Sequence, residues 1–121
     1  MRVKNIFIKE TSDNLAVLEK ELTNSESLSK GAVEMVIHTM HNIKGTAPMV
    51  GFNSLPQIAT PVELAFKEIQ NNKLEVDGGM VEKTKNAVLV LQKLLQTEEA
   101  HTPNSEEEQK ILIDYFNTIT G

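Results

Sequence analysis

The chain has 121 residues and a net charge of −5, a length that fits one domain with its own hydrophobic core. It has no cysteine, which excludes disulfides, thiolate zinc sites and cysteine nucleophiles. The negative charge argues against a nucleic-acid-binding face, and no apolar run is long enough to cross a bilayer. The segment Met1–Glu10 also lacks the apolar stretch of a signal peptide. We therefore expect a single cytoplasmic domain over residues 1–121 that contacts neither nucleic acid nor membrane.

Apolar residues recur at helical spacing from the start of the chain, and no segment alternates as a strand would. The first helix is expected over Asn5–Leu22, or from Ser12 if the polar residues at 11–14 delay its start. The second is expected over Lys30–Val50. Pro48 lacks a backbone donor, so we expect this helix to kink or end near it.

Three more helices are expected in the second half of the chain. The third covers Ser54–Gln70, with a bend or a late start because of Pro61. The fourth covers Gly79–Gln96 after an N-cap at Asp77, and the fifth begins near Ser105. Five amphipathic helices with short connections predict an all-α fold, an up-and-down four-helix bundle with an additional C-terminal helix.

The buried face of the second helix is the best defined, because its apolar residues keep a 3.6-residue period. The side chains expected to face the core are Val33, Val36, Ile37, Met40, Ile43, Ala47 and Val50. The methionines of this region are also expected to fill the core; they are Met35, Met40 and Met49. His41 lies off this stripe, about 100° around the helix from Met40, and is therefore expected to be accessible to solvent.

The residues that could carry chemistry also lie on the second helix. The chain has no nucleophile-elbow, Walker or Rossmann glycine pattern, so attention falls on the histidines. His38 and His41 share one helix face, and Lys44 and Gly45 follow His41 by one turn. A neutral imidazole is a nucleophile near pH 7. An ammonium group can offset the charge of an attached phosphoryl group, and a glycine leaves room for that group and for a partner.

The segment His41-Asn42-Ile43-Lys44-Gly45-Thr46-Ala47-Pro48-Met49-Val50-Gly51-Phe52 resembles the His-x-x-Lys-Gly-x-x-x-x-x-Gly signature of histidine-containing phosphotransfer (HPt) domains. The matching positions are His41, Lys44, Gly45 and Gly51. The resemblance implies a two-component phosphoryl carrier without its own ATP site. His41 would accept a phosphoryl group from a histidine kinase or an aspartyl phosphate. It would then pass the group to the aspartate of a response-regulator receiver domain. No cofactor is implied for this chain, because the receiver supplies the magnesium.

Gly51-Phe52, Glu63 and the run at 72–77 are most similar to the phospho-accepting domain of the chemotaxis kinase CheA. That resemblance implies a hydrogen bond between Glu63, on the neighbouring helix, and the ring of His41. It also allows the chain to be one domain of a larger kinase. Two positions depart from the pattern. Pro48 replaces a small residue, and Thr60 stands where CheA proteins often have a second histidine.

Two other functions fit the same residues. A metal-binding bundle could use His38, His41 and a carboxylate such as Glu34 or Glu63, although zinc needs three or four ligands with supporting contacts. An adaptor bundle without chemistry is the other alternative. His38 is singled out only by its position: it could support His41 within the site or be an ordinary structural or solvated residue.

Overall fold

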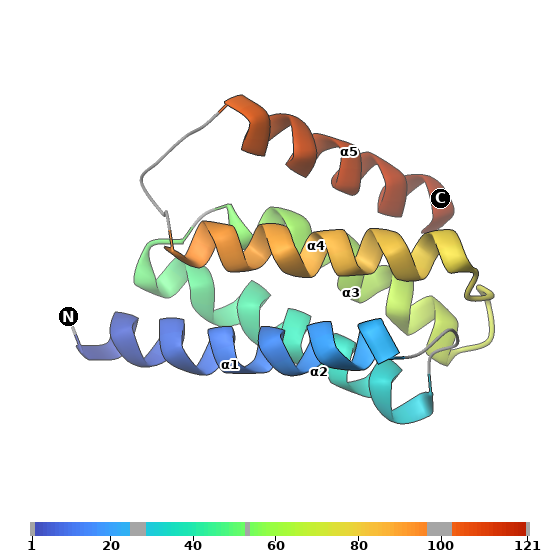
Figure 1. Ribbon diagram of the computed structural model, residues 1–121, viewed down its shortest axis with the longest axis horizontal. Helices are drawn as coiled ribbons and strands as arrows, with labels where there is room; N and C mark the ends of the chain where they lie inside the picture. The colour runs from blue at the N-terminus through green and yellow to red at the C-terminus, as the bar shows by residue number, and fades with distance from the viewer. Residues whose placement is uncertain (1, 25–28, 53, 97–102, 121) are drawn as a thin grey trace.

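The computed structural model describes residues 2–24, 29–52, 54–96 and 103–120, and no strand occurs within them. Five α-helices follow one another (Figure 1), with one 3₁₀ turn between the second and third. Their bounds are α1 Arg2–Asn24, α2 Lys30–Thr46, η1 Ala47–Val50, α3 Leu55–Gln70, α4 Gly78–Gln96 and α5 Pro103–Thr120. The expected all-α fold is confirmed.

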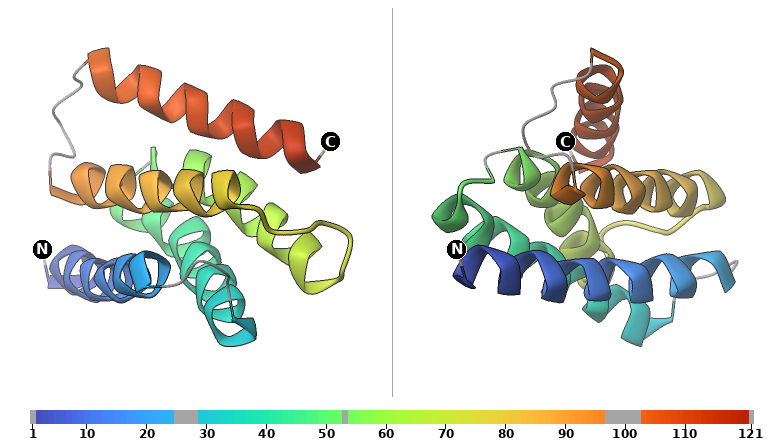
Figure 2. Two further views of the ribbon diagram at one scale, coloured as in Figure 1. Left: turned by 45° about the vertical axis from the view of Figure 1, so that its right-hand side comes forward. Right: turned by 60° about the vertical axis from the view of Figure 1, so that its left-hand side comes forward.

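The first four helices form a four-sided bundle. Each packs on its neighbours around the square, while the diagonal pairs α1/α3 and α2/α4 have no Cα atoms within 8 Å of each other in the described part of the chain. The most extensive pairing joins α2 to α3. The fifth helix lies outside the square, against α3 and α4 and away from α1 (Figures 1 and 2). This arrangement is the predicted bundle with an additional C-terminal helix.

The helix α1 is longer than either sequence-based alternative. It begins at Arg2 and continues without a break through the polar residues at 11–14, so the late start near Ser12 is wrong. Local preference for caps and turns is overcome because one face of the helix is buried against α4 and α2. Thr11 itself is buried there, together with Phe7, Leu15, Leu18 and Leu22.

Side-chain hydroxyl and carboxyl groups fix the starts of α2 and α4. The Ala32 N–H donates to Ser29 Oγ at 3.1 Å, and the Met80 N–H donates to Asp77 Oδ1 at 2.8 Å. Both are N-caps that satisfy an otherwise free donor of the first turn. The predicted start at Lys30 and the predicted cap at Asp77 are therefore confirmed. The start of α5 precedes the expected Ser105 by two residues, at Pro103.

The two prolines act differently. At Pro48 the α-helix has already ended at Thr46 and a 3₁₀ turn has replaced it, so the expected helix end near this proline is confirmed. The change of geometry turns Met49 outward to 83% exposure, so its expected place in the core is wrong. At Pro61 the helix continues from Leu55 to Gln70 with the proline buried, so a late start of α3 is wrong.

Gly51 ends the 3₁₀ turn in the left-handed region, with φ 94°, where residues with a Cβ are strained. The turn is closed by the Phe52 N–H, which donates to the Ala47 carbonyl at 2.9 Å. Phe52 is thereby directed into the core, with its ring centroid 5.7 Å from that of Phe7. Gly51 thus has a structural role beside the candidate site: it ends the 3₁₀ turn that follows the helix carrying His41.

The core is continuous through the bundle. It includes most of the stripe predicted for the second helix and adds Ala32 and Thr39 on α2. Ile37 on α2 and Val50 in the 3₁₀ turn are only partly buried. On α4 the buried residues include five at helical spacing: Val81, Thr84, Val88, Leu91 and Leu95. Within the described residues, every fully buried side-chain nitrogen and oxygen has a hydrogen-bond partner. None of the described helices is long and apolar enough to cross a membrane.

Candidate functional site

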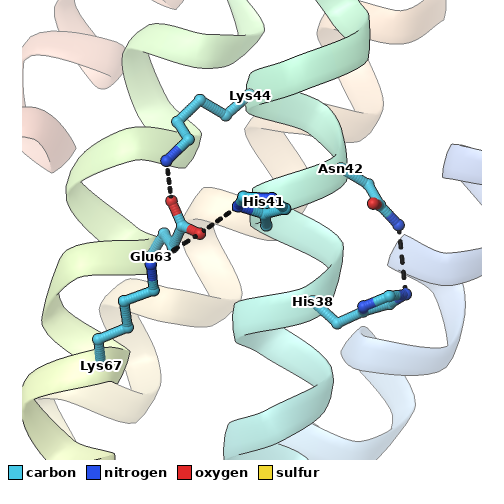
Figure 3. A network of polar contacts seen from close by, with 6 residues as sticks. All are labelled: His38, His41, Asn42, Lys44, Glu63 and Lys67. Carbon is cyan, nitrogen blue, oxygen red and sulfur yellow. Dashed lines mark hydrogen bonds and ion pairs between the residues drawn. The ribbon is translucent and has the colours of Figure 1, made fainter.

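The site forms along the edge of the seam between α2 and α3. Met40 and Val62 are completely buried in the seam, and the next residue on each helix is turned by about 100°. Those next residues are His41 and Glu63. Because α2 and α3 run in opposite directions here (Figure 3), the two side chains meet at the same level. On each helix, therefore, the polar side chain lies at the edge of the buried apolar face, one residue after a fully buried side chain.

His41 and Glu63 are in direct contact. The Nδ1 atom of His41 lies 2.9 Å from Oε2 of Glu63, and the His41 side chain is 65% exposed whereas that of Glu63 is only 3% exposed. An ionised carboxylate is an acceptor only, so Nδ1 carries the hydrogen in this contact. The tautomer leaves the lone pair of Nε2 free. The accessibility predicted for His41 and its contact with Glu63 are both present.

Lys44 joins His41 and Glu63 to complete the trio of residues predicted for the site. Its Nζ donates to Oε1 of Glu63 at 2.5 Å, so each carboxylate oxygen takes one group from α2. Lys44 lies one turn after His41 on the same helix, and Figure 3 shows both side chains directed at Glu63. The buried carboxylate thus connects the histidine to the lysine of the motif.

A second lysine, Lys67, joins the site from α3. Its Nζ lies 3.4 Å from Oε2 of Glu63, the oxygen that also faces His41. Sequence reasoning missed this residue, although a signal was present: Lys67 follows Glu63 by four residues, the spacing and order in which a helical Glu–Lys pair meets.

The surroundings of Glu63 act on its acidity in opposite directions. Burial raises the pKa of the carboxyl, while hydrogen bonds from Lys44 and His41 and the charges of Lys44 and Lys67 lower it. The hydrogen bonds and the lysine charges together outweigh burial, so the pKa of Glu63 lies below its usual range. The carboxyl is therefore ionised at neutral pH, although almost no solvent reaches it.

The remaining predicted residues lie around the trio. Gly45 lies next to the last residue of α2 rather than in mid-helix, and a Cβ built on it would meet no atom within 4 Å. Packing inside the chain therefore does not demand a glycine here. His38 is exposed, and the amide of Asn42 donates to its Nε2 at 3.3 Å. Its partner is thus Asn42 and not the ring of His41.

A shallow hollow of about 250 Å³ adjoins His41. His38, Lys67 and Glu34 are among the residues that line it. Although two histidines and two carboxylates border this hollow, no group of three or more metal-ligating side chains among the described residues has an arrangement that could hold a metal ion. Thr60, the departure noted above, is exposed on α3.

Comparison with known proteins agrees with the motif. The family model for the Hpt domain matches residues 2–101. Chemotaxis protein CheA of Listeria monocytogenes is 29% identical over 85 residues, which cover 64% of this chain and 13% of that protein. The protein of the same name from Listeria innocua gives the same values. CheA of Treponema pallidum is 25% identical over 100 residues, 83% of this chain and 12% of that protein.

The chain thus spans about an eighth of the length of these curated relatives. No solved structure gives a significant match. The family model covers all four positions of the motif, together with Glu63 and Lys67. Because the match takes in most of the chain, this protein belongs to the Hpt domain family.

Proposed function

We propose that this chain is a phosphoryl carrier of a two-component pathway and that His41 is its phospho-accepting residue. The observation that carries the proposal is the contact between the exposed ring of His41 and the buried carboxylate of Glu63. A carrier needs a nucleophilic nitrogen that a partner can reach, and the contact leaves Nε2 in that condition.

The proposed chemistry needs no group from this chain beyond the ring and its neighbours. The lone pair of Nε2 attacks the phosphorus of the donor, the N–P bond forms and the P–O bond breaks, and its electron pair leaves with the donor's oxygen. The ring then carries a positive charge while Nδ1 keeps its hydrogen. The carboxylate of Glu63 stabilises that charge. In the second half of the cycle an aspartate oxygen of the receiver attacks phosphorus, and the N–P electron pair returns to Nε2.

Lys44 and Gly45 have complementary roles in this proposal. The ammonium group of Lys44 offsets the negative charge of the phosphoryl group. Because Gly45 has no side chain, nothing at this position obstructs the approach to His41. In-line transfer requires such access, since the partner's reacting oxygen must come close to the ring. The open space above Gly45 supports this role.

The proposed partners are a histidine kinase catalytic domain and a response-regulator receiver domain that holds its own magnesium. The relatives are named chemotaxis proteins, so a chemotaxis-like pathway is the one we propose. In this proposal the chain binds no ATP, holds no cofactor and works in the cytoplasm, either alone or as one domain of a kinase.

The test is a phosphorylation assay of the purified chain with phosphoramidate, a small phosphodonor, and with a panel of histidine kinases. One acid-labile, alkali-stable phosphoryl group should form on the wild-type chain. His41→Gln should abolish it with an unchanged helical circular dichroism spectrum, and the matched variant His38→Gln should retain it. Phosphate uptake by His41→Gln would show that the accepting residue is wrongly assigned.

A further inference from the structure

Glu63 has more cationic partners than one carboxylate needs. Lys44 contacts Oε1 at 2.5 Å, and Lys67 lies 3.4 Å from Oε2. Two ammonium groups face this one carboxylate, so Glu63 and its two lysine partners together carry one positive charge. A phosphoryl group brings about −1.5 to −2 charges, so the surplus fits the phosphorylated state better than the free state.

Lys44 is required both as the partner of Glu63 and as the cation that binds the phosphoryl group, and the two requirements conflict. A buried carboxylate that loses its charged partner is costly, and a phosphoryl group on His41 also needs an ammonium group close by. In this structure the Nζ of Lys44 is engaged by Glu63 Oε1, so a phosphoryl group on the far nitrogen of the His41 ring would draw on the same ammonium group. Unless another cation holds Glu63, Lys44 serves one of them at the expense of the other.

Lys67 is placed to resolve this conflict. It lies on α3, four residues after Glu63, so its contact with the carboxylate does not depend on α2. It approaches Oε2, the oxygen that faces His41 Nδ1, whereas Lys44 holds the other oxygen. Its side chain is also about half exposed, which leaves it free to move closer. Figure 3 shows the two lysines on opposite sides of the carboxylate.

We propose that Lys67 is a positioning residue that keeps Glu63 paired while Lys44 leaves the carboxylate to bind the phosphoryl group. This inference rests on the proposed function. It assigns to Lys67 an effect that operates through Lys44, without contact between Lys67 and the transferred group.

The experiment is a double-mutant cycle with phosphoramidate as the donor, which transfers its phosphoryl group to the ring with release of ammonia. Lys67→Met should slow phosphorylation of His41 by roughly two- to fivefold, the effect of an ion pair of ordinary strength. In a Lys44→Met background the same substitution should have no further effect, since the lysine that it frees is gone. Lys67→Arg should restore the rate.

Lys9→Met is the matched control, because it removes the same charge from an exposed position on α1, which does not contact α3. It should leave the rate unchanged. Independent effects of Lys67→Met and Lys44→Met, which multiply in the double variant, would overturn the inference, as would a wild-type rate for Lys67→Met. Neither result touches the proposed function, which fails only if wild-type His41 accepts no phosphoryl group, and the inference then fails with it.

Discussion

Glu63 Oε2 lies 2.9 Å from His41 Nδ1, so a buried carboxylate faces one nitrogen of an exposed ring. The contact makes the two ring nitrogens unequal. Nδ1 is engaged as a donor, while Nε2 keeps its lone pair.

We expect the phosphoryl group to be attached to Nε2 of His41. Attack through Nδ1 would require that atom to lose its hydrogen and to leave Glu63, at the expense of a charge-assisted hydrogen bond. Nuclear magnetic resonance of the phosphorylated chain with ¹⁵N-labelled histidine distinguishes the two isomers by their nitrogen–phosphorus couplings. A phosphoryl group on Nδ1 would contradict the assigned tautomer.

We expect Glu63→Gln to slow phosphorylation by a kinase. General acid–base assistance contributes about 10²–10⁴-fold to the rate in favourable cases. Because His41 is exposed, we expect the loss of rate in Glu63→Gln to lie at or below the lower end of this range. The exposed Glu82→Gln on α4 is the matched control and should keep the wild-type rate. Donation to a receiver should suffer less, because the receiver's magnesium organises that step. Equal forward rates for Glu63→Gln and wild type would reduce Glu63 to a structural residue.

The same carboxylate should make the stability of the fold depend on pH. The pKa of Glu63 lies below its usual range because the hydrogen bonds from Lys44 and His41 and the lysine charges outweigh burial. A group of this kind contributes stability that is fully present above its unfolded pKa of about 4.3 and is lost as the pH falls through the lower folded value.

Glu63→Gln should therefore lower the free energy of unfolding by about 1–2 kcal/mol at pH 7, and the difference from wild type should shrink below about pH 5. Urea unfolding followed by circular dichroism at several pH values measures it. The Glu82→Gln variant should show no such convergence with wild type. A difference that stays constant from pH 7 to pH 3 would mean that the ionised carboxylate is not what stabilises the fold.

Substitutions of Gly45 should separate folding from access. A Cβ at this position meets no atom within 4 Å, so Gly45→Ala should be tolerated and should raise stability by up to about 1 kcal/mol through helix propensity. Gly45→Leu should also fold, while its side chain obstructs the receiver one turn from His41. Thermal unfolding and transfer to a receiver measure the two effects. Rapid transfer from phosphorylated Gly45→Leu would refute the access argument.

Helix boundaries were predictable where a cap or a proline marks them. Ser29 and Asp77 fix the starts of α2 and α4 by side-chain bonds, and Pro48 follows the end of the α2 helix. The alternatives of a late start for α1 near Ser12 and for α3 after Pro61 were wrong, because packing decided there. A buried face outweighs local preference, because the burial of several apolar side chains exceeds the cost of a few poor helix formers or one lost backbone bond.

The sequence by itself determined the all-α class, the apolar stripes and the motif at His41, Lys44 and Gly45, since each depends on spacing within one helix. Resemblance to a family also indicated Glu63. Only the tertiary structure decided that this carboxylate is buried, that Lys67 is its third partner, and that Met49 is turned outward. These features depend on the packing of α2 against α3 and on the 3₁₀ turn between them. Contacts between residues that are distant in the sequence are set by the relative placement of helices, which the periodicity of one helix does not contain.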